Sequence, residues 1–168
     1  MLPIPPSPRL AAALALMLLA ADTSGCCRRR GETFSPEASS AAWSRFLPPP
    51  ADPEVGALLE GLKSGDSVQG YPVVAVGAVS TDGVIPIVLV KEGTGVMVKV
   101  AELSDVPPPP ASSKHFGVYY ETFHGLKPLP GNDVTRVVED IAARLKRTED
   151  KVPQPKGMKP LPRPTQPA

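Results

Sequence analysis

Aromatic residues are scarce: they make up 5% of the 168-residue chain, whereas hydrophobic residues as a whole make up 42%. A core of this composition has to rest mainly on Val, Leu and Ala side chains. Charge of one sign is not in excess either, since 18 basic side chains face 17 acidic ones and leave a formal charge of +1. The composition therefore gives nucleic-acid binding no electrostatic support, and the length predicts one domain rather than two.

Cysteine is nearly absent, and the two that occur, Cys26 and Cys27, are neighbours. A structural zinc site takes four ligands, commonly from spaced cysteine pairs, so this pair does not predict one. A disulfide between distant segments is excluded because the chain has no third cysteine. The pair needs another explanation, and the residues before it suggest one.

An apolar run precedes the two cysteines. Residues 10–21, LAAALALMLLAA, carry no charge; they follow Arg9 and lead into the small and turn-forming residues 22–25. A membrane-spanning helix needs roughly 20 apolar residues, whereas the core of a secretory signal needs roughly 7–15. We therefore expect residues 1–25 to be a signal peptide.

The residues directly before Cys26 carry a resemblance to a known family. Ser24 and Gly25 match the lipobox of bacterial lipoprotein precursors, while Thr23 stands where that motif usually has leucine. Over residues 1–26, and not beyond them, the chain resembles such a precursor. The resemblance implies a thioether-linked diacylglycerol on the sulfur of Cys26 and an acylated new N-terminus. The protein is then expected in the cell envelope, lipid-anchored to the outer membrane and facing the periplasm.

Residues 26–34 would form the tether of such an anchor. Its arginines, residues 28–30, would lie at anionic headgroups, where each basic side chain contributes roughly 1 kcal/mol. Cys27 is an alternative modification site. Two other interpretations stay open for this segment: an ordinary cleaved secretory signal and an uncleaved membrane anchor.

Residues 35–148 predict a small α+β domain: two short N-terminal helices, a four-stranded, mainly antiparallel sheet and a C-terminal helix. Each N-terminal helix opens with a capping residue followed by proline, and Asp82–Gly83 predicts a tight turn between the first two strands. Pro86 suggests an edge or a bulge, because it cannot donate to a sheet ladder. The helices are expected at residues 35–47, 52–62 and from Asn132 or Asp133 to 147, and the strands at residues 71–79, 84–91, 96–103 and 115–123. The last helix has an apolar face of Val134, Val137, Val138, Ile141 and Leu145.

The C-terminal residues 149–168 are basic, rich in proline and poor in apolar side chains. Such a composition predicts a disordered tail, because it offers little to bury. The positive charge of this tail suggests contact with an anionic polymer or with another envelope protein. The membrane is the other expected partner, through the N-terminal lipid, and no nucleic acid is expected.

Residues that could carry chemistry are few. His115 and His124 bracket the fourth strand at a separation that does not favour a shared metal ion. Tyr71, Tyr119 and Tyr120 bring apolar rings with polar tips, which would suit a ligand pocket near His115. The chain has no phosphate-binding loop, dinucleotide fingerprint or serine-nucleophile elbow.

These patterns favour a non-enzymatic, lipid-anchored envelope protein that acts as a binding or assembly module. Cys26 is the one residue expected to be modified, and no catalytic residue, metal or cofactor is expected. The alternative is an envelope enzyme or small-ligand carrier that uses the pocket near the three tyrosines. The sequence names neither the partner nor the ligand.

Overall fold

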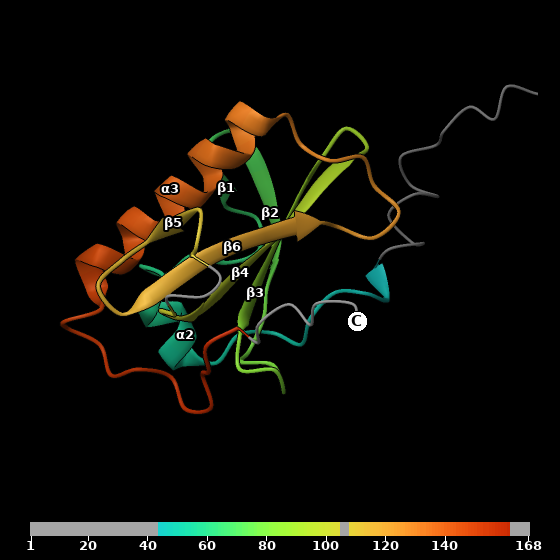
Figure 1. Cartoon of the computed structure of the whole chain (residues 1–168). Coiled ribbons are helices and arrows are strands. Elements are labelled where there is room, and N and C mark those ends of the chain that lie inside the picture. The colour runs from blue at the N-terminus through green and yellow to red at the C-terminus, as the bar shows by residue number, and fades with distance from the viewer. Residues whose placement is uncertain (1–43, 105–107, 162–168) are drawn as a thin grey trace, which may run out of the picture. The chain divides into compact units, whose positions relative to one another are not determined.

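An antiparallel six-stranded sheet forms the centre of the computed structural model, which describes residues 44–104 and 108–161. The strand order is β1-β2-β3-β4-β6-β5, and α3 lies along one face (Figure 1). The strands are β1 (Ser67–Val68), β2 (Tyr71–Val76), β3 (Ile85–Lys91), β4 (Thr94–Glu102), β5 (Ala111–Ser112) and β6 (Phe116–Thr122); the helices are α2 (Pro53–Leu58) and α3 (Gly131–Thr148). The predicted α+β class with an antiparallel sheet is confirmed. The prediction of four strands is wrong, since the sheet has six. The two strands that the sequence did not predict, β1 and β5, have only two residues each and therefore show no alternating pattern.

The alternating valines of β4 build the middle of the sheet. Val96, Val98 and Val100 are fully or almost fully buried in the main core, and β4 pairs with β3 on one side and β6 on the other. Side chains two residues apart on a strand share a face, so all three valines point toward the same core. The predicted period-2 pattern is therefore confirmed for this strand.

Pro86 lies inside β3, where it pairs with Lys99 of β4. Its other side faces the end of β2, whose last pair with β3 joins Val76 to Ile87. Beyond that pair Gly77 donates its N–H to the carbonyl of Pro86, at 2.8 Å. The missing N–H of the proline therefore falls opposite Gly77, just past the last paired residue of β2, where it costs the sheet one hydrogen bond at the end of the β2–β3 ladder.

The turn before β3 has the predicted conformation at its glycine. Gly83 has a φ of +80°, and its N–H donates to the carbonyl of Ser80 at 2.9 Å. Ser80 in turn donates to the carbonyl of Val84, at 2.8 Å. A residue with a Cβ resists a positive φ, so this position favours glycine.

The N-terminal helices differ from the prediction. The first, at residues 35–47, falls mostly outside the described residues, and the second, α2, ends at Leu58 rather than near Leu62. Gly61 donates to Gly56 at 2.7 Å and Glu60 to Ala57 at 3.3 Å, which is the hydrogen-bond pattern of a Schellman C-terminus. Glu60 adopts a φ of +56° in this motif, so the helix stops at a non-glycine residue that sequence patterns do not mark as a stop.

The long C-terminal helix α3 packs as its periodicity predicts. The five apolar residues expected on one face are all buried, together with Ala142. This face belongs to the same core cluster as the valines of β4, and the helix lies against β5, β6 and α2. An isolated helix of this length is marginal in water, so its stability comes mainly from this burial.

Hydrogen bonds tie both edges of the sheet to α3. At the β1–β2 edge the Tyr71 hydroxyl donates to Asp133 at 2.7 Å. At the β5–β6 edge the Ser113 hydroxyl donates to Glu149, also at 2.7 Å. The sheet therefore curls around the helix, and residues from both of its edges meet helix side chains.

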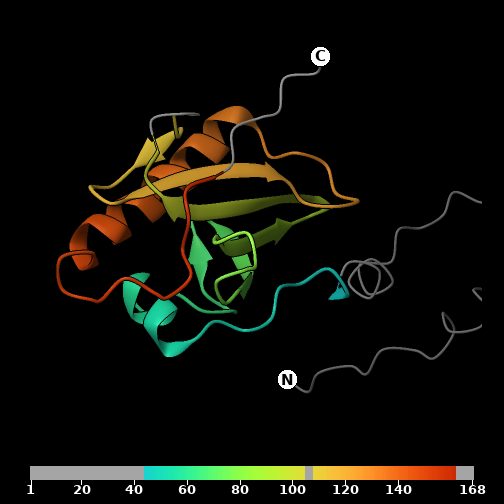
Figure 2. The same ribbon diagram turned by 60° about the horizontal axis from the view of Figure 1, so that its bottom comes forward.

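The segment after α3 departs from the predicted disorder over residues 151–161. Met158 is buried, the N–H of Lys159 donates to Gly83 at 2.9 Å, and the N–H of Glu102 donates to Lys159 at 3.3 Å. Figure 2 shows this segment, in red, running back from α3 toward the ends of the strands. One buried methionine and two backbone hydrogen bonds hold this segment in place, although its average composition predicts no ordered structure. Residues 162–168 lie outside the described residues.

Candidate functional site

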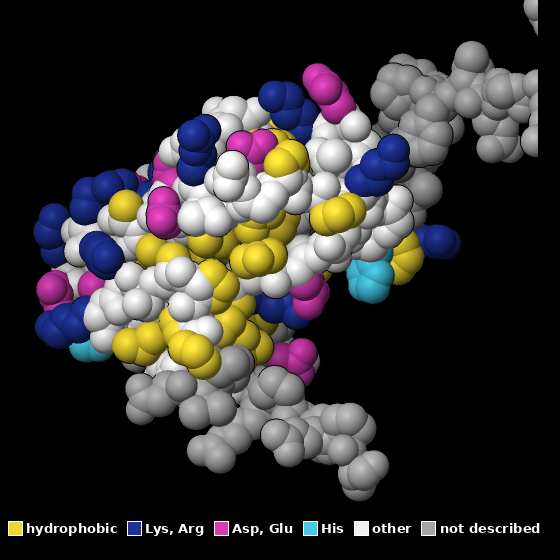
Figure 3. All heavy atoms as spheres, turned by 45° about the horizontal axis from the view of Figure 1, so that its top comes forward, with side chains coloured by type: hydrophobic (Ala, Val, Ile, Leu, Met, Phe, Trp, Pro, Cys, Tyr) yellow, Lys and Arg dark blue, Asp and Glu magenta, His cyan; other side chains and the backbone are white. Residues whose placement is uncertain are grey.

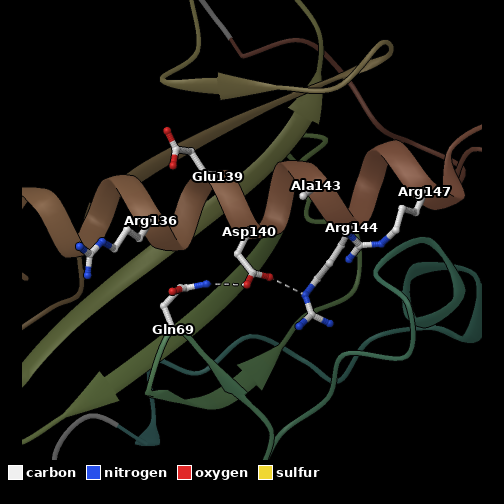
Figure 4. A pocket seen from close by; sticks show the side chains of 7 residues that line it. All are labelled: Gln69, Arg136, Glu139, Asp140, Ala143, Arg144 and Arg147. Carbon is white, nitrogen blue, oxygen red and sulfur yellow. Dashed lines mark hydrogen bonds and ion pairs between the residues drawn. The ribbon is translucent and has the colours of Figure 1, made fainter.

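A polar hollow lies beside α3, next to the turn between β1 and β2 (Figure 4). Its volume is about 500 Å³, and all of its lining side chains but one come from the helix. The α3 residues recur at intervals of three and four, which places them on neighbouring rows of the helix surface. The lining residues are Gln69, Arg136, Glu139, Asp140, Ala143, Arg144 and Arg147.

The Asp140 carboxylate holds the centre of this hollow. Its Oδ1 accepts a hydrogen bond from Nε of Arg144 at 2.8 Å, and its Oδ2 accepts one from Nε2 of Gln69 at 2.9 Å. Burial alone would raise the pKa of Asp140, but the hydrogen bonds from Arg144 and Gln69 outweigh it and lower that pKa. Asp140 is therefore a charged, half-buried carboxylate that fixes the position of Arg144.

Arg147 is held at the end of the hollow by a residue from another element. Its Nε and Nη2 donate to the two carboxylate oxygens of Glu60, which follows α2. The hydrogen bond from Arg147 lowers the pKa of Glu60. This two-point contact is the geometry in which a guanidinium and a carboxylate fit best.

Arg136 differs from the other two arginines of the hollow. It has no ion pair and no hydrogen bond among the residues that the structure describes. Glu139, the remaining acidic residue of the lining, points away from Asp140 and Gln69 (Figure 4). With Arg144 paired to Asp140 and Arg147 paired to Glu60, the lining charges without a partner among the described residues are those of Arg136 and Glu139.

Three non-glycine residues in the described part of the chain have a positive φ, and the side chains of two of them contact residues of this hollow. These two are Glu60, at +56°, and Gln69, at +52°. Gln69 and Gly70 form the two-residue turn between the paired residues Val68 and Tyr71, and this turn favours Asn, Asp or Gly at its first position. A left-handed conformation costs an ordinary residue roughly 1–2 kcal/mol, so both side chains are kept at strained positions beside α3.

The basic character of this region extends along the helix. Lys146 and Arg147 lie in the last turn of α3, where positive charge favours the helix dipole. In the space-filling view, Lys and Arg side chains gather at the left, where α3 ends, with Asp and Glu side chains among them and a band of hydrophobic side chains beside them (Figure 3). The hollow is therefore one part of a mixed but arginine-rich surface.

The three tyrosines of the predicted pocket do not converge. Tyr71 donates its hydroxyl to Asp133, and this hydrogen bond raises the pKa of Tyr71. Tyr119 is buried, which raises its pKa, and it packs with Val84. Tyr120, the next residue of β6, is exposed and points to the opposite face of the sheet, where it pairs with Val98.

His115 lies near Ser113, Glu149 and Asp150, but their hydrogen bonds fix the backbone of residues 113–115 to the end of α3, an arrangement called the clamp below. The Ser113 hydroxyl donates to Glu149, and the backbone N–H groups of Lys114 and His115 donate to the same carboxylate at 3.1 and 3.0 Å. Nε2 of His115 is 3.9 Å from Oδ1 of Asp150, beyond hydrogen-bonding distance. A nucleophilic serine needs a hydrogen-bonded base, and Ser113 is bonded to a carboxylate instead.

His124 lies at the other end of β6, with its ring centroid 5.5 Å from that of Phe46. The two histidines are therefore separated, as their sequence spacing predicts. Among residues 44–104 and 108–161, no group of three His, Cys, Asp or Glu side chains is placed to hold a metal ion.

A second hollow, also of about 500 Å³, is mainly apolar. It lies where the extended segment of residues 47–53 and the residues after α2 approach β2. The backbone of residues 49–51 pairs with β2 at this place, because Ala51 donates to Val76 at 3.0 Å and Ala78 donates to Pro49 at 3.1 Å. This groove holds few polar side chains to orient a ligand.

The predicted lipidation site, Cys26, lies outside the described residues together with the whole signal-like segment. In the described part of the chain, no helix is both long and apolar enough to cross a membrane. No family model, curated protein or solved structure matches the chain.

The polar hollow was not predicted from the sequence, although the spacing of its α3 residues is visible there. Arg136, Asp140 and Arg144 follow one another at intervals of four on a helix that was predicted, which places them on one face. Gln69 and Glu60 carry no comparable signal, since they are 71 and 87 residues away from their partners on α3.

Proposed function

We propose that the protein is a non-enzymatic binding protein of a bacterial cell envelope, anchored to a membrane by lipid at Cys26. The charged hollow beside α3 carries the binding part of this proposal. Its central carboxylate and Arg144 are fixed by hydrogen bonds from two separate elements before any ligand arrives. Groups held in place in this way lose little conformational freedom on binding, which favours a ligand site.

The location is supported by the residues around Cys26. An apolar run too short to span a bilayer, followed by Ser24, Gly25 and a cysteine, is typical of a lipoprotein precursor. Several acyl chains anchor a protein stably, whereas a single chain holds it only marginally. The membrane is thus the first partner, and an anionic envelope polymer or another envelope protein is the partner proposed for the basic C-terminal residues.

The alternative of an enzyme or carrier with a tyrosine-lined pocket has less support. Tyr119 and Tyr120 point to opposite faces of β6, and the hydroxyl of Tyr71 is engaged with Asp133. Ser113 donates to Glu149, and His115 lies 3.9 Å from Asp150, so these residues do not form the hydrogen-bonded series that nucleophilic catalysis needs.

The anchor is tested by membrane fractionation of cells that express the full chain. The parent is expected in the membrane fraction, and Cys26→Ser is expected to leave an unprocessed or soluble form. Cys27→Ser is the matched control, since it changes the same side chain one residue later and is expected to fractionate like the parent. If Cys26→Ser fractionates and is processed like the parent, the proposed anchor is wrong.

A further inference from the structure

Arg136 lies where an ion pair would be expected, and it has none. Asp140 is four residues from Arg136 and four from Arg144, so on spacing alone it could pair with either. Its two oxygens are instead engaged by Arg144 and by Gln69. The guanidinium of Arg136 is left at the hollow without a partner among the described residues.

Arg144 also keeps unused donors. Its contact with Asp140 is made by Nε, and its two Nη groups make no hydrogen bond in the described part of the chain. Arg136 and Arg144 are eight residues apart, a rise of about 12 Å along a helix; Arg144 extends from the side of α3 that faces Gln69, whereas Arg136 extends along the helix, away from Arg144 (Figure 4). A ligand shared by both would require the exposed side chain of Arg136 to turn back across the hollow.

We propose that this hollow binds a phosphate-bearing ligand, held by the guanidinium of Arg136 and the Nη groups of Arg144. Asp140 and Gln69 are positioning residues that hold Arg144 and leave Arg136 unpaired. A planar guanidinium donates two parallel hydrogen bonds to a phosphate. A tetrahedral phosphate offers oxygens to two such groups from different directions, whereas a planar carboxylate is largely satisfied by one.

The conformation of Gln69 is a second, independent observation. Asparagine in place of Gln69 would relieve the backbone strain of the Gln69–Gly70 turn, because asparagine adopts a positive φ more readily. Asparagine is shorter, however, and would not keep the 2.9 Å contact with Asp140. The strained glutamine therefore fits a role in the hollow better than a role in the turn.

This inference rests on the proposed function, because it names the ligand of a binding protein. Its test does not depend on the lipid anchor, so the two can fail separately. The same phosphate chemistry could come from free phosphate or from a phospholipid headgroup, and two probes separate these sources.

The test uses the full chain in nonionic detergent, titrated by calorimetry with inorganic phosphate and, separately, with glycerophosphoglycerol, a water-soluble phosphodiester headgroup. Saturable binding with a dissociation constant on the order of 1 mM is expected for at least one probe. Arg136→Gln should weaken it at least about tenfold, because a hydrogen bond to a charged group contributes that much. Lys146→Gln, which removes a charge from α3 outside the hollow, should change it less than about twofold.

Gln69→Asn tests the positioning role. We expect it to unfold at the same or a higher temperature than the parent and to bind the probe several-fold more weakly. Binding of inorganic phosphate points to a free phosphate ligand, and binding of the phosphodiester alone points to a headgroup; either supports the inference if it depends on Arg136. No saturable binding of either probe, or equal losses in Arg136→Gln and Lys146→Gln, would overturn it. Unchanged affinity in Gln69→Asn would refute the role of Gln69.

Discussion

Removing residues 152–168 is expected to destabilise the domain strongly, although their composition indicates a dispensable tail. The deletion removes Met158, whose side chain is 7% exposed, and the two backbone hydrogen bonds of Lys159 with Gly83 and Glu102. Truncating a buried methionine to alanine typically costs about 2–5 kcal/mol. Each lost hydrogen bond adds about 0.5–1.5 kcal/mol. We therefore expect a loss of about 3–8 kcal/mol in the free energy of unfolding.

Such a loss is a large share of the roughly 5–15 kcal/mol by which domains are usually stable. In a domain of this size it lowers the unfolding temperature by about 10 °C or more. Thermal unfolding followed by circular dichroism measures it, with Met158→Ala in the intact chain expected to reproduce about half of the effect.

A chain ending at Leu161 is the matched control, because it keeps every contact that the structure describes for residues 151–161. It is expected to unfold within about 2 °C of the parent, a shift equivalent to less than 1 kcal/mol. If the chain that ends at Lys151 also unfolds at the temperature of the parent, the packing of this segment against the strands contributes nothing and the reasoning fails.

Three further changes test other parts of the fold. Ile141→Asp places a carboxylate in the centre of the apolar face of α3 and should cost several kcal/mol, measured by chemical denaturation; an unchanged midpoint would mean that the helix is not packed there. Gly83→Val forces a branched side chain into a φ of +80° and to within 2.5 Å of Lys159, so a loss of more than about 1 kcal/mol is expected, and an unaltered melting curve would argue against this turn. The pKa of Glu149 is lowered because hydrogen bonds from Ser113 and two backbone N–H groups outweigh the effect of burial, which by itself would raise it. Its contribution to stability is therefore present above its unfolded pKa and lost as the pH falls through the lower folded pKa. Glu149→Gln should then lose less stability than the parent as the pH falls below the usual pKa of a glutamate; equal acid sensitivity would refute the clamp.

The sequence predicts the parts of this fold whose signals are local and repeated. Helix α3 and strand β4 are examples, because their buried residues recur with the periods of a helix and of a strand. Strands β1 and β5 are too short to show any period, and they exist because longer neighbours provide partners for them. The early stop of α2 depends on Glu60 adopting a left-handed conformation, which residue preferences disfavour.

The candidate site was less accessible to sequence reasoning for a physical reason. The chemistry of tyrosine and histidine led to the predicted ligand pocket, but the fold places Tyr119 and Tyr120 on opposite faces of one strand. The polar hollow depends instead on common surface residues brought together from α3, from the turn before β2 and from Glu60, the residue after the C-cap of α2. Contacts over such separations along the chain appear only once the sheet has curled around the helix.

Intact-mass analysis of the mature protein, purified from bacterial membranes, tests the proposed envelope anchor most directly. We expect a chain that begins at Cys26, with added mass equal to one diacylglycerol and one acyl group, and no such addition in Cys26→Ser. A mature chain that begins at any other residue, or one that begins at Cys26 without lipid mass, would contradict it.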